Sequence, residues 1–163
     1  MSAVSRRSDE PPDEGQAGFE RILLASEGRP ISNAAIARVI DLAQGSQASV
    51  HVLSIARVHG VAFGLPNPGL LPTKREWDEQ RESVRRAVAR LRRKGIKADG
   101  HVLGTRNATK KILAEAAAEG CDAIVMGGDP DANRLLADFM WTQEPQRVRR
   151  KAKLPVFVVT DDA

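Results

Sequence analysis

Short apolar runs alternate along the chain with longer segments whose apolar residues recur at helical spacing. The runs at 22–25 and 123–126 are continuously apolar, which is typical of strands buried on both faces of a sheet. Strand-like patterns also occur at 50–55, at 98–103 and at 155–160. Strands that alternate with helices predict an α/β fold: a three-layer, doubly wound, five-stranded parallel sheet with helices on both sides.

The segments between these strands carry their apolar side chains on one helical face. Ser32 can cap the first helix and Gly45 can end it. A long helix is expected over 73–94, another begins at Asn107 or Thr109 and ends at Gly120, and a polar helical stretch precedes the last strand. The residues expected to face inward are Ile36, Val39, Ile40 and Ala43 in the first helix, Trp77, Val84, Val88 and Leu91 in the second, and Ile112, Leu113, Ala116 and Ala117 in the third.

Two parts of the chain lack this pattern. Residues 1–18 are polar and without apolar periodicity, which predicts a disordered tail ahead of a single domain at 19–163. The segment 57–72 holds three glycines and three prolines. It predicts a loop longer than about 12–15 residues, a length that is typical of lids and binding loops.

Composition narrows the class of protein. A hydrophobic share of 42% supports a packed core, and the longest apolar runs fall far short of a membrane span. The polar start of the chain is unlike a secretion signal, so we expect a cytoplasmic protein without membrane contact. The single cysteine, Cys121, excludes an internal disulfide and is expected to behave as a small buried hydrophobe. No histidine has a partner at helical spacing, so no metal site and no catalytic residue are predicted.

Basic residues are unevenly distributed although the net charge is only +4. The segment 81–97 has eight basic residues and one acidic residue, and a second basic cluster lies at 147–153. A solvated helix face is the main interpretation of the first cluster, and sequence-independent binding of nucleic acid is the alternative. The chain has no tyrosine and few other aromatic residues that could stack on bases, so a nucleic-acid partner is not predicted.

Two glycine-bearing turns follow buried strands. Glu27 and Gly28 come directly after the first strand, and Gly127 and Gly128 end the fourth. Ligands of doubly wound sheets bind beyond the carboxyl ends of the strands, where the winding direction reverses. If the two strands are neighbours, both turns flank one crevice, which is where a small-molecule ligand is expected.

Three segments together resemble the universal stress protein family. They are the apolar strand that ends in Ser26, Glu27 and Gly28, the segment 121–127 (CDAIVMG), and the closing segment 152–159 (AKLPVFVV). The resemblance implies a sheet in the order 3-2-1-4-5 and a role in stress tolerance or regulation without a settled catalytic activity. It also implies a homodimer joined through the last strand, whose residues are Val156, Phe157, Val158 and Val159.

The family's nucleotide-binding members carry Gly-x-x-Gly after the fourth strand and, about nine residues later, Gly-Ser or Gly-Thr. Here Gly127 matches the first glycine, but Pro130 stands at the second and has no N–H to offer a phosphate. Asp129 and Asp131 flank it, and Asp129 can cap a helix with the N–H groups that a phosphate would use. Of the second motif, only Thr142 remains to supply a hydroxyl.

The motif is therefore degenerate, and we expect a non-catalytic regulatory or stress-response module that lacks the usual ATP site and has no cofactor. The alternative is an adenine-nucleotide-binding member, for ATP, AMP or cyclic AMP, with altered geometry. In that case the crevice residues would be Glu27, Gly28, Gly127, Gly128 and Thr142. Glu27 occupies the place of an aspartate that helps to hold the nucleotide in binding members; otherwise it is a solvated carboxylate at a strand end.

Overall fold

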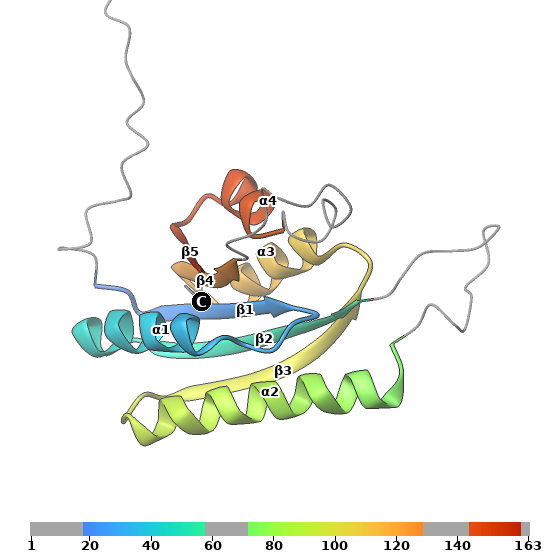
Figure 1. Ribbon diagram of the computed structural model, residues 1–163. Coiled ribbons are helices and arrows are strands. Elements are labelled where there is room, and N and C mark those ends of the chain that lie inside the picture. The colour runs from blue at the N-terminus through green and yellow to red at the C-terminus, as the bar shows by residue number, and fades with distance from the viewer. Residues whose placement is uncertain (1–17, 58–71, 129–143, 161–163) are drawn as a thin grey trace, which may run out of the picture.

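In the part of the chain that the computed structural model describes, residues 18–57, 72–128 and 144–160, five strands form one parallel sheet (Figure 1). The strand order is β3-β2-β1-β4-β5, and each neighbouring pair is parallel. This confirms the three-layer fold class and the order that the family resemblance implied. The strands are β1 (Arg21–Glu27), β2 (Ser49–Arg57), β3 (Ala98–Thr105), β4 (Ala123–Gly128) and β5 (Val156–Thr160).

Helices cover both faces of this sheet. The helices α1 (Asn33–Ser46) and α2 (Lys74–Arg93) pack on one face, and α3 (Ala108–Ala118) and α4 (Glu144–Lys151) pack on the other (Figure 1). Because every connection between parallel neighbours passes through a helix, the alternation seen in the sequence produces three layers. None of the described helices combines the length and the apolar character that a membrane span requires.

Side chains cap the helices where the sequence predicts that they begin. Ser32 caps α1, Thr73 forms a reciprocal capping box with Glu76 in α2, and Asn107 caps α3. The end of α1 differs from the prediction, because the helix continues through Gly45 to Ser46. Gln47 ends it in the left-handed conformation, and its N–H reaches the carbonyl of Ala43.

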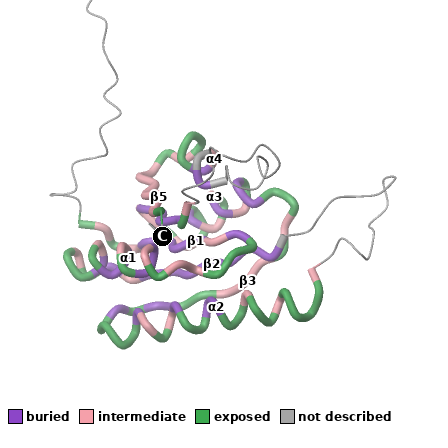
Figure 2. Tube along the Cα trace, in the orientation of Figure 1, coloured by how far each residue is buried: buried purple, intermediate pink, exposed green. Residues whose placement is uncertain are grey.

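Alternate residues of the central strands fill two apolar layers, one on each face. Figure 2 shows buried residues along the central strands and on the helices. A fully buried aliphatic side chain contributes roughly 1.5–3 kcal/mol, so these layers hold the sheet and helices together. On the first face lie Ile22, Leu24, Val50 and Val52 with residues of α1 and α2, and on the second lie Leu23, Leu53, Ile55 and Ile124 with Ile112 of α3 and Val148 of α4.

Most inward-facing positions of the helices are confirmed, with two differences. Ala117 is exposed, because the buried side of α3 is centred on Ile112 and Ala116 and Ala117 lies a further 100° around the axis. Trp77 is only half-buried, and its ring lies against the backbone of Gly104 in the edge strand β3. The expected tail at 1–18 and the expected loop at 57–72 lie almost wholly outside the described residues, so both remain predictions.

Candidate functional site: the crevice at the carboxyl ends of the strands

The two glycine-bearing turns lie side by side. Strand β1 pairs with β4, and the register that aligns Ala25 with Met126 brings Glu27 and Gly28 beside the end of β4. The start of α1 closes the same place, because a Cβ added to Gly127 would lie 3.5 Å from the Oγ of Ser32. The condition for a shared crevice, that the two strands are neighbours, is therefore met, and the ligand site itself stays a prediction.

Glu27 lies at this crevice as a buried carboxylate, with only 8% of the residue exposed. The interpretation as a solvated strand-end residue is therefore wrong. Burial of a charged group is costly unless other groups compensate for the lost hydration. A carboxylate held in such a place is typical of sites that accept hydrogen bonds from a ligand, such as those from sugar hydroxyl groups.

The turn after β1 uses several of its polar groups to hold its own shape. Gly28 has a φ of 62°, which favours glycine, and its N–H donates to the carbonyl of Ile55 over 2.8 Å. The hydroxyl of Ser26 donates to the carbonyl of Arg29. At the start of α1, the N–H groups of Ala35 and Ile36 donate to Ser32. These contacts fix the backbone, and they also occupy donors that could otherwise face a phosphate.

A groove adjoins the crevice on the side of α2. It has a volume of about 910 Å³ and runs between Gly28 and Pro30 on one wall and the first half of α2 on the other. Charged side chains of both signs line that half of the helix, among them Lys74 and Asp78. The volume lies in the range that small-molecule ligands occupy, roughly 300–1,000 Å³. The sequence-based site did not include this helix.

The signal for this groove lies in the inner face of α2, where two polar residues interrupt the apolar pattern. Gln80 contacts the buried hydroxyl of Ser54 at the carboxyl end of β2. The hydroxyl of Ser83, which is itself buried, accepts the N–H of Ile31 over 2.9 Å. The first contact ties α2 to β2, and the second ties it to the loop that follows β1.

The structure describes only some of the predicted site residues. Glu27, Gly28, Gly127 and Gly128 come together as expected. Thr142 lies outside the described residues, as do Asp129, Pro130 and Asp131. The degenerate motif therefore remains a prediction from the sequence.

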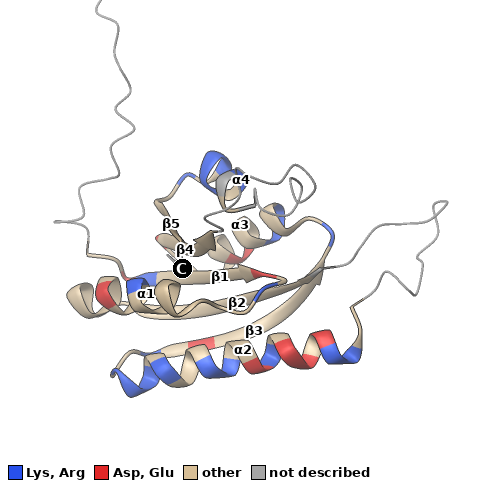
Figure 3. Cartoon of the chain, in the orientation of Figure 1, with Lys and Arg blue, Asp and Glu red and all other residues tan. Residues whose placement is uncertain are grey.

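Three basic residues of α2 have acidic partners on the same helix. Figure 3 shows that the acidic residues gather in the first half of this helix and that its last half is basic. Exposed pairs of this kind contribute at most about 1 kcal/mol each. The pattern suits the solvated face that we expected. The pairs are Arg75 with Glu79, Arg81 with Asp78 and Arg85 with Glu82.

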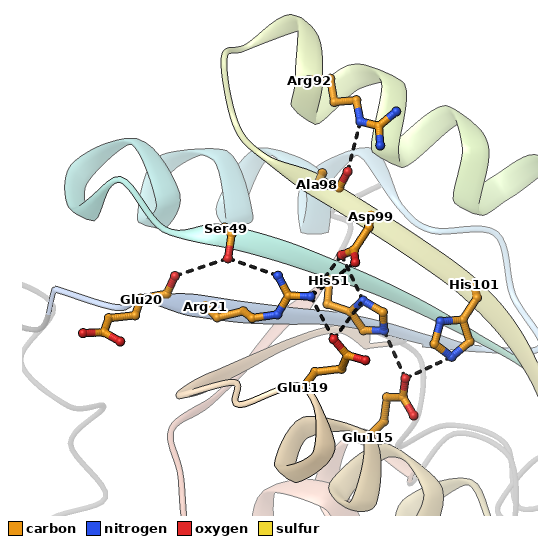
Figure 4. A network of polar contacts seen from close by, with 10 residues as sticks. All are labelled: Glu20, Arg21, Ser49, His51, Arg92, Ala98, Asp99, His101, Glu115 and Glu119. Carbon is orange, nitrogen blue, oxygen red and sulfur yellow. Dashed lines mark hydrogen bonds and ion pairs between the residues drawn. The ribbon is translucent and has the colours of Figure 1, made fainter.

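A second polar cluster lies at the opposite end of the sheet, on the face covered by α3 (Figure 4). Arg21, at the start of β1, donates to Asp99 of β3 and to Glu119 just after α3, at 3.1 Å and 2.9 Å. Partial burial acts to raise the pKa of Asp99, but the contacts with His51 and Arg21 outweigh it and lower that pKa. No sequence pattern indicates this cluster, because its members are far apart along the chain.

Two histidines belong to this cluster and face each other across β2 and β3. His51 is buried and His101 is partly exposed, and the centroids of their rings are 5.0 Å apart. Glu115 of α3 contacts the Nε2 atoms of both rings. Within the described part of the chain, the histidines thus have acidic partners that residue spacing did not reveal.

The fold and the crevice define a class: a doubly wound α/β protein with its candidate site at the switch point of the sheet. The sequence profile of the universal stress protein family matches residues 18–160. The chain belongs to the universal stress protein family.

Solved structures share this fold at low sequence identity. A universal stress protein family member from Burkholderia pseudomallei is 19% identical, with a TM-score of 0.66 over 88% of this chain and 98% of the other. The universal stress protein of Archaeoglobus fulgidus in complex with dAMP is 19% identical, with a TM-score of 0.62 over 87% and 98%. A family protein from Arabidopsis thaliana with AMP bound is 12% identical, with a TM-score of 0.57 over 88% and 93%. A comparison with curated proteins gave no match.

Proposed function

We propose that this chain is a non-catalytic regulatory module of the universal stress protein family whose crevice does not serve as an ATP site. The observation that carries the proposal is the polarity of the crevice. A buried carboxylate, Glu27, lies there, while the N–H groups of Gly28, Ala35 and Ile36 already have acceptors within the chain. A triphosphate needs the opposite arrangement, with unengaged N–H donors and positive charge.

The sequence beyond β4 points the same way. Pro130 replaces a glycine whose N–H would bind phosphate, and Asp129 and Asp131 add two carboxylates beside it. Two like charges at contact distance repel by about 1 kcal/mol in water and by more where water is excluded. A polyphosphate would meet this repulsion several times over.

A second candidate function is the binding of an adenine nucleoside monophosphate in the same crevice. Two relatives of the same fold are known in complex with dAMP and with AMP. The carboxylate of Glu27 can accept hydrogen bonds from ribose hydroxyl groups, and the adjoining groove offers room for a base. A single phosphate carries less charge against the acidic residues than a triphosphate does.

Calorimetric titration of the full chain with ATP, AMP and cyclic AMP, each with Mg²⁺, tests both candidates. We expect no heat of binding for ATP and no release of phosphate over hours. Binding of AMP would establish the second candidate, and Glu27→Gln should then weaken it by roughly tenfold, since a hydrogen bond to a charged group is worth about 1.5–3 kcal/mol. Tight binding or hydrolysis of ATP would contradict the proposal.

A gain-of-function variant makes the test sharper. The double change Pro130→Gly with Asp131→Ala returns a glycine to the family's position and removes one acid. If these residues close the phosphate site, ATP binding should appear in this variant. The matched control is Asp41→Ala, which removes an exposed acid of α1 away from the crevice. Appearance of ATP binding in the control would indicate a general effect of charge.

We also propose that two copies associate through β5. This strand is an edge of the sheet, and its apolar residues are only half-buried within one chain. Val158→Glu should convert a dimer to a monomer in light scattering coupled to size-exclusion chromatography. Thr160→Glu, at an exposed position of the same strand, is the matched control. A wild-type chain that is monomeric at all concentrations would contradict this.

A further inference from the structure

His51 lies between two carboxylates, one at each nitrogen of its ring. Its Nδ1 is 3.0 Å from Oδ1 of Asp99, and its Nε2 is 3.1 Å from Oε1 of Glu115 (Figure 4). The side chain is only 3% exposed, so water cannot substitute for either partner. A neutral imidazole has one donor and one acceptor, whereas carboxylates only accept. One of the two contacts therefore requires either an additional proton, on the ring or on the carboxyl group, or a metal ion between the nitrogen and the oxygen.

We propose that His51 Nε2, His101 Nε2 and Glu115 Oε1 bind a divalent transition-metal ion, with Zn²⁺ as the best fit. Two imidazoles and a carboxylate are a donor set that zinc prefers, and such three-ligand sites keep a fourth position for water. The three atoms lie within 4.8 Å of one another. They come from β2, β3 and α3, all of them regular elements that hold their side chains in place.

The two distances from Glu115 to the histidines need little adjustment to suit the ion. Glu115 Oε1 is 3.1 Å from the Nε2 of His51 and 2.9 Å from that of His101. Tetrahedral zinc, with bonds of roughly 2.0–2.2 Å, separates its ligand atoms by about 3.3 Å. The carboxylate would move outward by a few tenths of an ångström, which rotation about its side-chain bonds allows.

The surroundings of His51 match those of a metal-binding histidine. A metal-bound imidazole almost always donates its other N–H to a carboxylate, which fixes the ring and its tautomer. Asp99 occupies that position at Nδ1 and is itself held by Arg21 at 3.1 Å. Nε2 is thereby left to face Glu115 and His101.

The contacts of Arg21 favour this group of metal ligands over a second group that shares His51. His51, Asp99 and Glu119 also lie close enough together to hold an ion. However, the guanidinium of Arg21 already contacts both of those carboxylates, at 3.1 Å and 2.9 Å. A second cation there would be repelled at contact distance. The group around Glu115 has no such positive charge among the contacts described.

The proposed site is open to solvent on one side. Glu115 is 12% exposed and His101 is 41% exposed, and β3 is an edge strand that α2 covers on its other face. An ion can therefore reach the site past His101, while His51 forms its buried side. The proposal concerns the opposite end of the sheet from the crevice, so it does not depend on the proposed function.

Titration of the full, untagged chain with ZnCl₂, after treatment with a chelator and without nucleotide, tests the proposal. Calorimetry should give one Zn²⁺ per chain, and elemental analysis after desalting should find the metal retained. Co²⁺ should produce the visible absorption of a tetrahedral site. Zinc binding should release protons and should weaken in acidic buffer, as it does at any site whose ligands must be deprotonated.

Variants distinguish the proposed ligands from their neighbours. His101→Ala changes a partly exposed residue, so the fold should persist, as circular dichroism can verify. It should lower zinc affinity by at least about 100-fold, since even loss of an outer partner costs roughly 10–100-fold. Asp99→Asn should lower the affinity within that range, and Glu119→Gln, the matched control, should leave it unchanged.

The proposal is overturned by any of three results: no zinc is retained by the wild-type chain, His101→Ala binds zinc as well as the wild type, or Glu119→Gln abolishes binding while His101→Ala does not. The last result would place the ion on the side of Arg21.

Discussion

The two ends of the sheet differ in how their polar residues are placed along the chain. At the carboxyl end, Glu27 and Gly28 are adjacent in sequence, as are Gly127 and Gly128, and they form a crevice from two short turns. At the amino end, the contact between Arg21 and Glu119 joins residues 98 positions apart. The first arrangement can be recognised as a motif, and the second cannot.

The difference follows from what each end does in this fold. Turns at the carboxyl end connect strands to the helices that follow, so a ligand site there is built from short contiguous segments. The amino end is assembled from strand starts and the end of α3, and its polar residues share only a face of the sheet. It is there that His51 lies buried among charged partners.

Substitution of one glycine at each end of the sheet should give the largest difference in the free energy of unfolding. A Cβ on Gly100, next to the amino-end cluster, would lie 2.6 Å from the carbonyl oxygen of Val52, whereas one on Gly127 meets only an ordinary contact at 3.5 Å. Gly100→Ala should therefore lower the free energy of unfolding by about 2 kcal/mol, and Gly127→Ala by less than about 0.5 kcal/mol. Urea denaturation measures both, and equal losses would show that the two ends are packed alike.

The next largest expected effect is the difference in reactivity of Cys121 between the folded and the unfolded chain. Burial raises the pKa of this thiol to about 11, the carboxylates of Glu119 and Asp122 add to the effect, and Arg21 opposes it. At about pH 8 the native thiol should react with iodoacetamide at least about tenfold more slowly than the same thiol in the urea-unfolded chain, because less thiolate is present. Equal rates in the two states would mean that this end of the sheet opens readily to solvent.

The smallest effect is the pH dependence that Asp99 contributes. The pKa of Asp99 is lowered in the folded chain, so its ionised form stabilises the fold at pH values above the pKa of the unfolded chain, about 3.9. This stabilisation is lost as the pH falls through the lower pKa of the folded chain. The side chain is 59% exposed, so solvent screening keeps this contribution below about 1 kcal/mol. Asp99→Asn should flatten the acid side of the stability curve, measured by urea denaturation between about pH 2 and 6.

Asp41→Asn, an exposed aspartate of α1, serves as the control for that measurement. If both variants change the curve to the same extent, the contacts of Asp99 with His51 and Arg21 contribute nothing measurable in solution.

Local pattern was sufficient for most of the fold. Apolar runs placed the strands, and Ser32, Thr73 and Asn107 cap helices where the sequence predicts them. Details set by packing were not accessible, such as the exposure of Ala117 and the end of α1 at Gln47. The spacing of apolar residues predicts which side of a helix is buried, whereas packing against the sheet determines which residues at the edge of that side are exposed.

The candidate site was predictable in part for the same reason. The crevice glycines and Glu27 follow from the order of strands and turns, but the burial of Glu27 and the groove beside α2 do not. Gln80 and Ser83 hold α2 against the crevice by contacts with residues of two other elements. Such contacts depend on how helices dock, which no single segment specifies.

The amino-acid sequence by itself determined the alternation of strands and helices, the caps, and the residues that place the chain in its family. These features rest on propensity and periodicity, which act over a few residues. Only the tertiary structure decided that Arg21, His51, Asp99, His101 and Glu115 meet at one end of the sheet. Their meeting depends on strand order and register, because a shift of one residue in β2 or β3 would turn these side chains to the opposite face. That register is fixed by the burial of both apolar layers at once, and therefore by the chain as a whole.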